Sequence, residues 1–192
     1  MTEVDDNSYR KYIYSESIIS RRVRLPFTAV GNKKKLEKNL ETMISHLLEG
    51  KCSKEGYIQV GTLKILTYSV GLQVGNDVEF EVVIKCYICN PTEGMRIRCV
   101  VKNNTGAGVR AELNKELEMK SFIPERQYER NKDKYKDQDY NSPIVVYLAS
   151  EQHMGNTLDK YNVGDIITIE VIGQRYELND LHVNIIGKLV EK

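Results

Sequence analysis

Two alternating segments on either side of Asn90-Pro91 constrain this chain more than any other feature. From Val78 to Ile88 apolar residues occupy one parity and charged residues the other. This period of two indicates a half-buried strand. After the proline turn the alternation resumes from Met95 to Val101, with a basic opposite face made by Arg96, Arg98 and Lys102. We interpret the stretch from Val78 to Leu113 as the point where one small domain ends and a β-barrel begins.

Between Pro26 and Gly50 the apolar period changes to helical spacing. The recurring apolar residues are Leu36, Leu40, Met43, Ile44, Leu47 and Leu48. Asn32 stands at the N-cap position and Gly50 at the C′ position, which predicts a helix of about four turns with one buried stripe. Lys33, Lys34 and Lys35 crowd its first turn, where the macrodipole disfavours cations. They are either solvated charges or a docking patch for an acidic partner.

Short runs at 12–14 and 19–25 precede this helix, and a run at 57–66 follows it; we expect all three to form strands. Together they predict an α+β fold for an N-terminal domain over residues 1–90, in the order strand, helix, strand, strand. The next segment, 68–77, holds two glycines between apolar residues. We expect it either to turn tightly or to contact a partner.

Residues 91–192 predict a C-terminal β-barrel of five strands in the order of an OB-fold. The expected strands are 95–103, 107–113, 143–148, 166–172 and 181–189. Between the second and third strands, residues 114–142 are rich in mixed charges and lack periodicity, so we interpret them as a long insertion. This insertion is either a disordered loop or a clasp on a partner. A short helix or turn is expected at 150–153.

Composition narrows the functional classes. A formal net charge of +1 gives no bulk attraction to nucleic acid, so any such contact must come from local patches. The sequence has no apolar run long enough to cross a bilayer, and its N-terminus lacks the apolar stretch of a signal peptide. We therefore expect an intracellular protein without membrane association.

No motif indicates an enzyme, a cofactor or a metal site. The three histidines lie in a predicted helix, turn and strand, without a nucleophile motif or metal-ligand spacing: His46, His153 and His182. Cys86 and Cys89 have the spacing of half a zinc site. Residues three apart in a strand point to opposite faces, however, and no second cysteine pair completes the set. Buried free thiols are the expected state of the four cysteines.

Four pieces of sequence, in order along nearly the whole chain, carry a family resemblance. They are Leu25-Pro26-Phe27, the helix end 48–52 running into 56–58, the stretch 82–101, and the tail 166–173 through 186–189. Together they resemble the larger stalk subunit of multisubunit DNA-directed RNA polymerases, the family that contains the seventh subunit of eukaryotic RNA polymerase II and its archaeal counterpart.

The resemblance implies a non-catalytic subunit made of two domains. Members of the family dock on the polymerase core through the tip of the N-terminal domain, pair with a smaller helical stalk partner, and hold an OB-fold near the RNA exit path. By position, the docking loop corresponds to 66–77, with candidate contacts Tyr68, Val70, Gly71, Leu72, Val74 and Gly75. Gly71 and Gly75 are expected to be turn residues that let the backbone enter a crevice.

RNA contact is expected to be weak and directed at phosphates. Barrels of this type stack bases on aromatic residues of the second and third strands, but the expected aromatic position falls here at Gly108. The remaining candidate RNA contacts are Arg96, Arg98, Lys102, Arg110 and Tyr147. The alternative function is a free-standing OB-fold RNA-binding protein in translation or RNA decay.

Abundant Lys, Asn, Ile and Tyr are typical of an AT-rich genome, and a large DNA virus with its own polymerase is one such source. A cellular eukaryotic stalk subunit would reside in the nucleus. A viral one would reside in the host cytoplasm and the virion.

Overall fold

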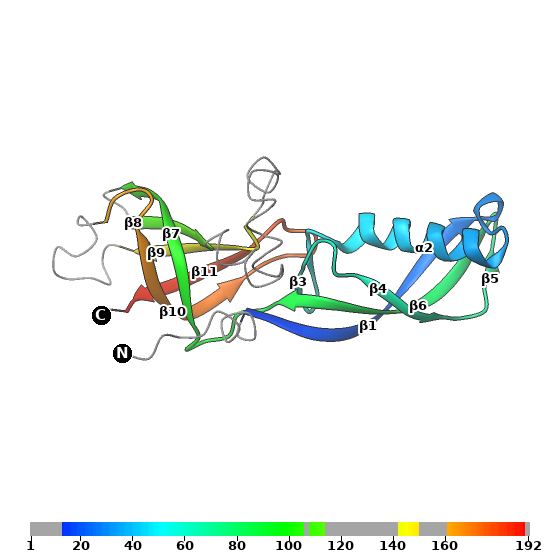
Figure 1. Cartoon of the computed structure of the whole chain (residues 1–192), viewed down its shortest axis with the longest axis horizontal. Helices are drawn as coiled ribbons and strands as arrows, with labels where there is room; N and C mark the ends of the chain where they lie inside the picture. Colours follow the sequence, from blue (N-terminus) through cyan, green and yellow to red (C-terminus); the bar gives the residue numbers. More distant parts are fainter. Residues whose placement is uncertain (1–12, 106–107, 114–141, 150–160, 191–192) are drawn as a thin grey trace, which may run out of the picture.

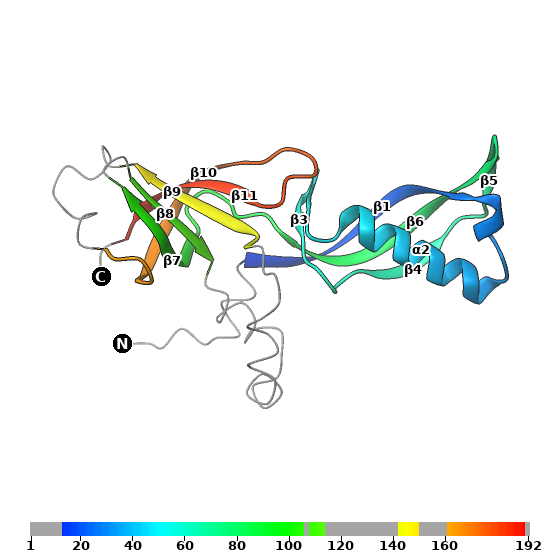
Figure 2. The same cartoon turned by 90° about the horizontal axis from the view of Figure 1, so that it is seen from above.

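The structure is a computed structural model that describes residues 13–105, 108–113, 142–149 and 161–190. The described chain is mostly β-strand with few helices. It forms an elongated molecule, with a closed barrel at one end and an open sheet at the other (Figure 1). Helix α2 (Lys33–Leu48) lies along one face of the open sheet (Figure 2).

One long strand, β6 (Asp77–Cys89), is the spine of the open sheet. Along one side it pairs over its full length with β1 (Tyr14–Pro26). Along the other side it pairs in turn with β5 (Leu72–Val74), β4 (Lys64–Tyr68) and β3 (Gly56–Ile58), and β2 (Cys52–Ser53) pairs with β3. The predicted alternation from Val78 to Ile88 is confirmed, because the apolar parity is buried throughout.

The predicted helix and both of its caps are confirmed. The Asn32 side chain accepts a hydrogen bond from the Lys35 amide at 3.0 Å, and Gly50 follows the helix with a left-handed φ of 73°. Leu40 and Ile44 are fully buried against the sheet. Leu47, predicted to join this stripe, is instead exposed. The short 3₁₀ helix η1 (Phe27–Ala29) leads from β1 towards α2.

Two strand predictions in this part of the chain were wrong. The runs at 12–14 and 19–25 are not separate: residues 14–26 form the single strand β1, because β6 supplies a partner for every residue between them. The strand predicted at 57–66 is interrupted between β3 and β4, where Gly61 adopts a φ of 74°. The predicted loop at 68–77 contains the short strand β5.

The barrel contains the five strands that were predicted. They are β7 (Arg96–Thr105), β8 (Gly108–Leu113), β9 (Ile144–Ala149), β10 (Ile166–Arg175) and β11 (Val183–Leu189). They close in the order β7-β8-β9-β11-β10, with β9 and β11 parallel and the other pairs antiparallel. This arrangement is consistent with an OB-like barrel. Strand β10 extends three residues beyond its predicted end at 172, through a register shift between Val171 and Gly173.

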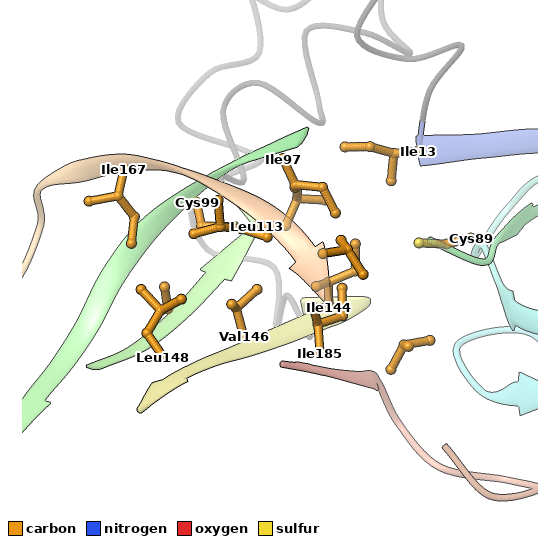
Figure 3. Close-up of a cluster of buried hydrophobic side chains, with 14 of the residues drawn as sticks. Ile13, Cys89, Ile97, Cys99, Leu113, Ile144, Val146, Leu148, Ile167 and Ile185 are labelled. Atoms are coloured by element: carbon orange, nitrogen blue, oxygen red, sulfur yellow. The ribbon is translucent and has the colours of Figure 1, made fainter. Parts of the chain in front are cut away.

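The barrel core continues into the near end of the open sheet. Inward side chains of all five strands, among them Ile97, Leu113, Ile144, Ile167 and Ile185, form one buried cluster (Figure 3). The same cluster includes residues of the sheet: Ile13, Tyr14, Cys52, Tyr57 and Cys89. Because this core includes residues on both sides of position 90, the domain boundary at that position stays a prediction.

Backbone hydrogen bonds also join the two parts. The Cys52 amide donates to the Asp180 carbonyl at 2.7 Å, and the Asn179 amide donates to the Cys52 carbonyl at 2.9 Å. The β10–β11 loop therefore lies against β2, at the near end of the sheet.

Two sequence predictions fall mainly outside the described residues. Of the insertion at 114–142, only Ser142 is described; it is buried, and its hydroxyl accepts a hydrogen bond from the Leu113 amide. The short helix or turn expected at 150–153 lies wholly outside the described residues.

Candidate functional site

At the end of the sheet far from the barrel, two distant chain segments enclose an apolar groove of about 420 Å³. Phe27 lines it from η1, Val30 from the connection after η1, and Leu36 from the first turn of α2. The other side is formed by the connection from β4 to β5, and β6 contributes the floor. Val78 and Phe80 belong to the buried cluster that packs against α2, so the groove lies on the same face of the sheet as that helix. The elements that line it meet at the N-terminal end of α2, at the end of the sheet far from the barrel (Figure 1).

The floor of the groove is rigidly packed. Tyr68 meets Phe80 edge to face, with ring centroids 6.4 Å apart and planes at 80°, an arrangement that adds to the burial energy of the two rings. The Tyr68 hydroxyl donates to Glu37 on α2 at 3.4 Å. These contacts tie the end of β4 to both the floor and the helix.

Gly71 brings the backbone directly onto that floor. A Cβ atom at this position would lie 2.5 Å from Val78 Cγ1 and 2.9 Å from the Phe80 ring, closer than real Cβ atoms approach such groups. Its φ is not left-handed. Gly71 lies in the connection from β4 to β5 and outside the turn at 75–76, so the prediction that it is a turn residue was wrong. Glycine is favoured here because the backbone closely approaches Val78 and Phe80.

The turn of the chain follows β5 and joins it to β6. Val74 pairs with Asp77 across a two-residue turn, and Gly75 adopts a φ of 64° at the first turn position, as in a type II′ hairpin. Within the described residues, β5 pairs with β6 alone, so its other edge carries no strand. An uncovered edge is a ready template for pairing with another chain.

Apolar side chains are exposed at this end of the sheet. Val70 and Phe27, which line the groove, are 93% and 68% exposed. Leu72 and Val74 are also exposed, but they alternate with the groove-lining Gln73 on β5 and therefore face the other side of the sheet. Exposed apolar residues that gather in one place mark interaction sites, whereas scattered ones do not. We call the groove and these four residues the apolar end.

All six residues predicted to dock on a core lie at this apolar end, and their docking role stays a prediction. Tyr68, Val70 and Gly71 line the groove, Leu72 and Val74 lie on β5, and Gly75 forms the turn. The sequence did not indicate Phe27, Val30 and Leu36 as part of the same surface. Phe27 lay in the Leu25-Pro26-Phe27 motif and Leu36 in the apolar stripe of the helix, but neither pattern shows that these residues meet the segment 68–71.

The candidate RNA contacts lie on the outside of the barrel, where carboxylates offset much of their charge. Arg96 pairs with Glu170 at 3.6 Å, while Lys102 and Arg110 pair with Glu112 at 4.0 and 3.1 Å. Arg98 lies on β7 opposite Thr168 of β10. Acidic and basic side chains are therefore interspersed on this surface, and they do not form a continuous basic surface.

Tyr147 is the aromatic residue of this surface on strands β8 and β9. It is 45% exposed and lies opposite Arg110 on one side and the exposed Ile186 on the other. Gly108, where an aromatic was expected, lies opposite Ala149 and offers no ring. Among the described residues of β8 and β9, Tyr147 thus offers a ring for stacking next to the Arg110 guanidinium.

All four cysteines are buried free thiols, and the pKa of three of them lies above the ordinary value. Burial raises the pKa of Cys99 to about 12 and that of Cys86 to about 11; burial and then the Asp180 charge raise the pKa of Cys52 to about 12. These thiols stay protonated at neutral pH. Cys86 and Cys89 also pack in different clusters. Among the described residues, no group of three or more His, Cys, Asp or Glu could hold a metal ion.

In the part of the chain that the structure describes, no helix has the length and apolar character required to span a membrane. No protein-family model matches the sequence, and no curated protein is significantly similar to it.

Proposed function

We propose that this chain is a non-catalytic stalk subunit of a DNA-directed RNA polymerase. It docks on the core enzyme through the apolar end and positions its barrel near the path of the nascent RNA. The observation that carries the proposal is the exposed groove at the far end of a long sheet whose other end is fixed to a barrel. The sequence resemblance supplies the identity of the partner.

The assignment of the two parts has its own support. The strand order of the barrel and its parallel β9–β11 pair favour an OB-fold. Helix α2 packed on the β1–β6 sheet favours an α+β tip domain. The β10–β11 loop bonded to Cys52 favours a fixed angle between them. In this proposal a smaller helical stalk partner also binds, and the protein works wherever its polymerase works.

RNA contact is a minor part of the proposal. A phosphate-binding surface gains affinity by releasing counterions from each neutralised phosphate. Glu112 and Glu170 reduce that gain here, because they already pair with Arg96, Lys102 and Arg110. Tyr147 can stack one base, so we expect weak binding that depends little on sequence.

The test is co-purification with the polymerase. We expect Val70→Asp with Leu72→Asp to prevent recovery of the large polymerase subunits on the tagged chain. Both positions are exposed, so the free protein should stay folded. Leu72→Asp faces Glu79 across the β5–β6 pair, and this like-charge pair should cost up to about 1 kcal/mol. These point changes are cleaner than removal of 70–75, which would delete β5 and uncover Val78 and Phe80.

Val163→Asp with Ile166→Asp is the matched control, since both residues are exposed and lie at the barrel. This variant should recover the polymerase as the unaltered chain does. Equal recovery by the Val70→Asp, Leu72→Asp variant would refute docking through the apolar end.

The alternative, a free-standing RNA-binding protein, is favoured only by Tyr147 beside Arg110. In that case the unaltered chain would recover RNA without polymerase subunits. Arg96→Ala with Arg98→Ala would then weaken RNA binding strongly and reduce the salt slope by about 0.7 for each phosphate that is no longer neutralised. The stalk proposal expects this variant to assemble with the polymerase normally.

A further inference from the structure

Strands β1 and β5 both lie at edges of the open sheet, and β1 is protected against pairing with another chain. Among the described strands β1 pairs with β6 alone; it carries Arg22 and Arg24 and ends at Pro26. Arg21 points to the α2 face of the sheet, because it lies opposite Val82 of the buried cluster. Charged residues, inward-pointing charges and proline are the features by which natural edge strands avoid the addition of a further strand.

The edge of β5 lacks these features. The segment 65–76, which contains β5, holds no charged residue and no proline, although 29% of the chain is charged. Val70 and Leu72 are largely exposed within this segment. The one protective feature is the length of β5, which has three residues. A strand added here can therefore form only a short ladder, and its specificity must come from the side chains beside that ladder.

Gln73 directs its backbone N–H and C=O towards the open edge. Val74 and Asp77 flank a two-residue turn and form a hydrogen-bonded pair, so Gln73 and Val78 form the next pair, which is not hydrogen-bonded. The amide and carbonyl of Gln73 therefore point away from β6. Within the described residues, Gly71 makes no backbone–backbone hydrogen bond either. The edge thus offers backbone groups at two positions two residues apart.

This spacing indicates an extended polypeptide as the occupant. An extended strand directs N–H and C=O groups to one neighbour at every second residue, the same repeat as Gly71 and Gln73. A second copy of β5 would contribute only its three residues, a contact much smaller than the roughly 800 Å² per partner of a stable interface. A segment of a larger partner can continue past β5 and also contact the groove.

The groove determines which side chains such a segment needs. Residues directly opposite each other on paired strands share one face of the sheet. Because Gln73 lines the groove, the partner residue opposite it directs its side chain to the same apolar cavity, beside Phe27 and Val70. The partner residues on either side lie next to the exposed Leu72 and Val74 on the opposite face. Apolar or uncharged side chains gain most at all three positions.

We infer that an extended segment of the polymerase core adds to the edge of β5 as a further strand. Its central residue is apolar and enters the groove, and the two flanking residues are uncharged. Backbone hydrogen bonds to Gln73 hold the segment in register, while the groove selects the central side chain. This inference rests on the proposed function for the identity of the partner, and it adds the mode of binding and the chemistry of the partner's segment.

Gln73→Pro tests the backbone contact, since proline removes the outward N–H and leaves the pairing of β5 with β6 in place. We expect this variant of the full chain to bind purified polymerase core about tenfold more weakly, because a partner carbonyl loses its donor and the proline ring blocks the edge. Gln73→Ala is the matched control, which removes the side chain but keeps the N–H. It should bind within about threefold of the unaltered chain. Equal losses in the two variants would overturn strand addition in favour of a contact through the side chain.

Hydrogen exchange of the unaltered chain provides a measurement that does not depend on the fold of the proline variant. The Gln73 amide should exchange rapidly in the free chain and at least about tenfold more slowly in the complex with the core. The amides of Leu72 and Val74 belong to hydrogen-bonded pairs with β6, so their exchange should change less. Rapid exchange at Gln73 in the complex would refute strand addition.

The pattern of results separates this inference from the proposed function. If Val70→Asp with Leu72→Asp abolishes binding but Gln73→Pro binds as the unaltered chain does, strand addition is refuted and docking through the apolar end stands. If neither variant affects binding, docking is refuted and the inference falls with it. Light scattering of the free chain tests for a second copy: a dimer that Gln73→Pro converts to a monomer would also overturn the inference.

Discussion

The barrel and the apolar end differ in which groups they leave unpaired at the surface. In the barrel every strand has two neighbours, so no backbone edge is open among the described strands. Its outer charges pair across strands, with Glu170 next to Arg96 and Lys188. At the apolar end, by contrast, β5 has one strand neighbour among the described residues, and Val70 is almost fully exposed.

This difference indicates which end gains more from a partner. Burying apolar surface stabilises a complex by roughly 25 cal/mol per Å² before the costs of association are subtracted. A partner that breaks a surface ion pair gains little binding free energy, because the carboxylate that loses its counterion must be paired or hydrated again. In our proposal the apolar end therefore serves assembly, while the barrel, which also exposes Val163, Ile166 and Ile186, makes only weak contact with RNA.

The largest expected effect comes from adding one methyl group at the apolar end. We expect Gly71→Ala to lower the free energy of unfolding by about 1–3 kcal/mol, because its Cβ would overlap Val78 and Phe80. Gly173→Ala makes the same change in the barrel, where no atom lies within 4 Å of the new Cβ. That control should be neutral or stabilising by up to about 1 kcal/mol.

Chemical denaturation of both variants and of the unaltered chain measures these differences in the free energy of unfolding. Equal stability of Gly71→Ala and the unaltered chain would show that the connection from β4 to β5 is loosely packed. The groove would then be adaptable rather than preformed.

Much of this fold could be predicted from sequence wherever one side of an element is buried. The alternation along 78–88 required a half-buried strand, and β6 is one. Asn32 and Gly50 fixed the ends of the helix through local backbone chemistry. These patterns depend on residues close together in the sequence, so they can be interpreted without knowledge of the tertiary fold.

The remaining features depend on pairing between distant residues. The continuity of β1 follows from its register with β6, because its polar residues alone predict a break. The groove joins Phe27 to Val70, and no periodicity relates two segments so far apart in the chain. The steric role of Gly71 could not be predicted either, since it is set by Val78 and Phe80 beneath it.

A smaller loss of stability is expected in the β10–β11 loop, which joins the barrel to the near end of the sheet. Asn179 is the one non-glycine residue with positive φ in the described part of the chain, at 70°, and its amide donates a hydrogen bond to Cys52. A β-branched residue fits this conformation poorly, so Asn179→Val should cost about 1–2 kcal/mol. Asn179→Gly, which keeps the conformation, should stay within about 0.5 kcal/mol of the unaltered chain.

Hydrogen exchange at the Cys52 and Asn179 amides gives a local measure of this junction. Exchange should accelerate in Asn179→Val and remain slow in Asn179→Gly. Unchanged protection in both variants would mean that the buried cluster around Cys89 and Tyr57 holds the barrel in place without the loop.

The smallest expected effect concerns the surface ion pairs of the two parts. Hydrogen bonds from Lys188 and the charges of Lys188 and Arg96 hold the pKa of Glu170 below its ordinary value, and a hydrogen bond from Lys85 does the same for the pKa of Glu16 on the sheet. A carboxylate with a lowered pKa in the folded state stabilises the protein above its unfolded pKa, and this contribution is lost as the pH falls through the folded value.

The thermal midpoint of Glu170→Gln should therefore fall less between about pH 5 and about pH 3 than that of the unaltered chain. Glu16→Gln should show a smaller difference, since one lysine faces Glu16 where two cations face Glu170. Both differences should shrink in about 1 M salt, which screens exposed charges, while Glu93→Gln, in the exposed turn before β7, serves as the control. Identical acid sensitivity of Glu170→Gln and the unaltered chain would mean that the charges on the barrel are solvated rather than paired, and the contrast between the two ends would then rest on the apolar groove alone.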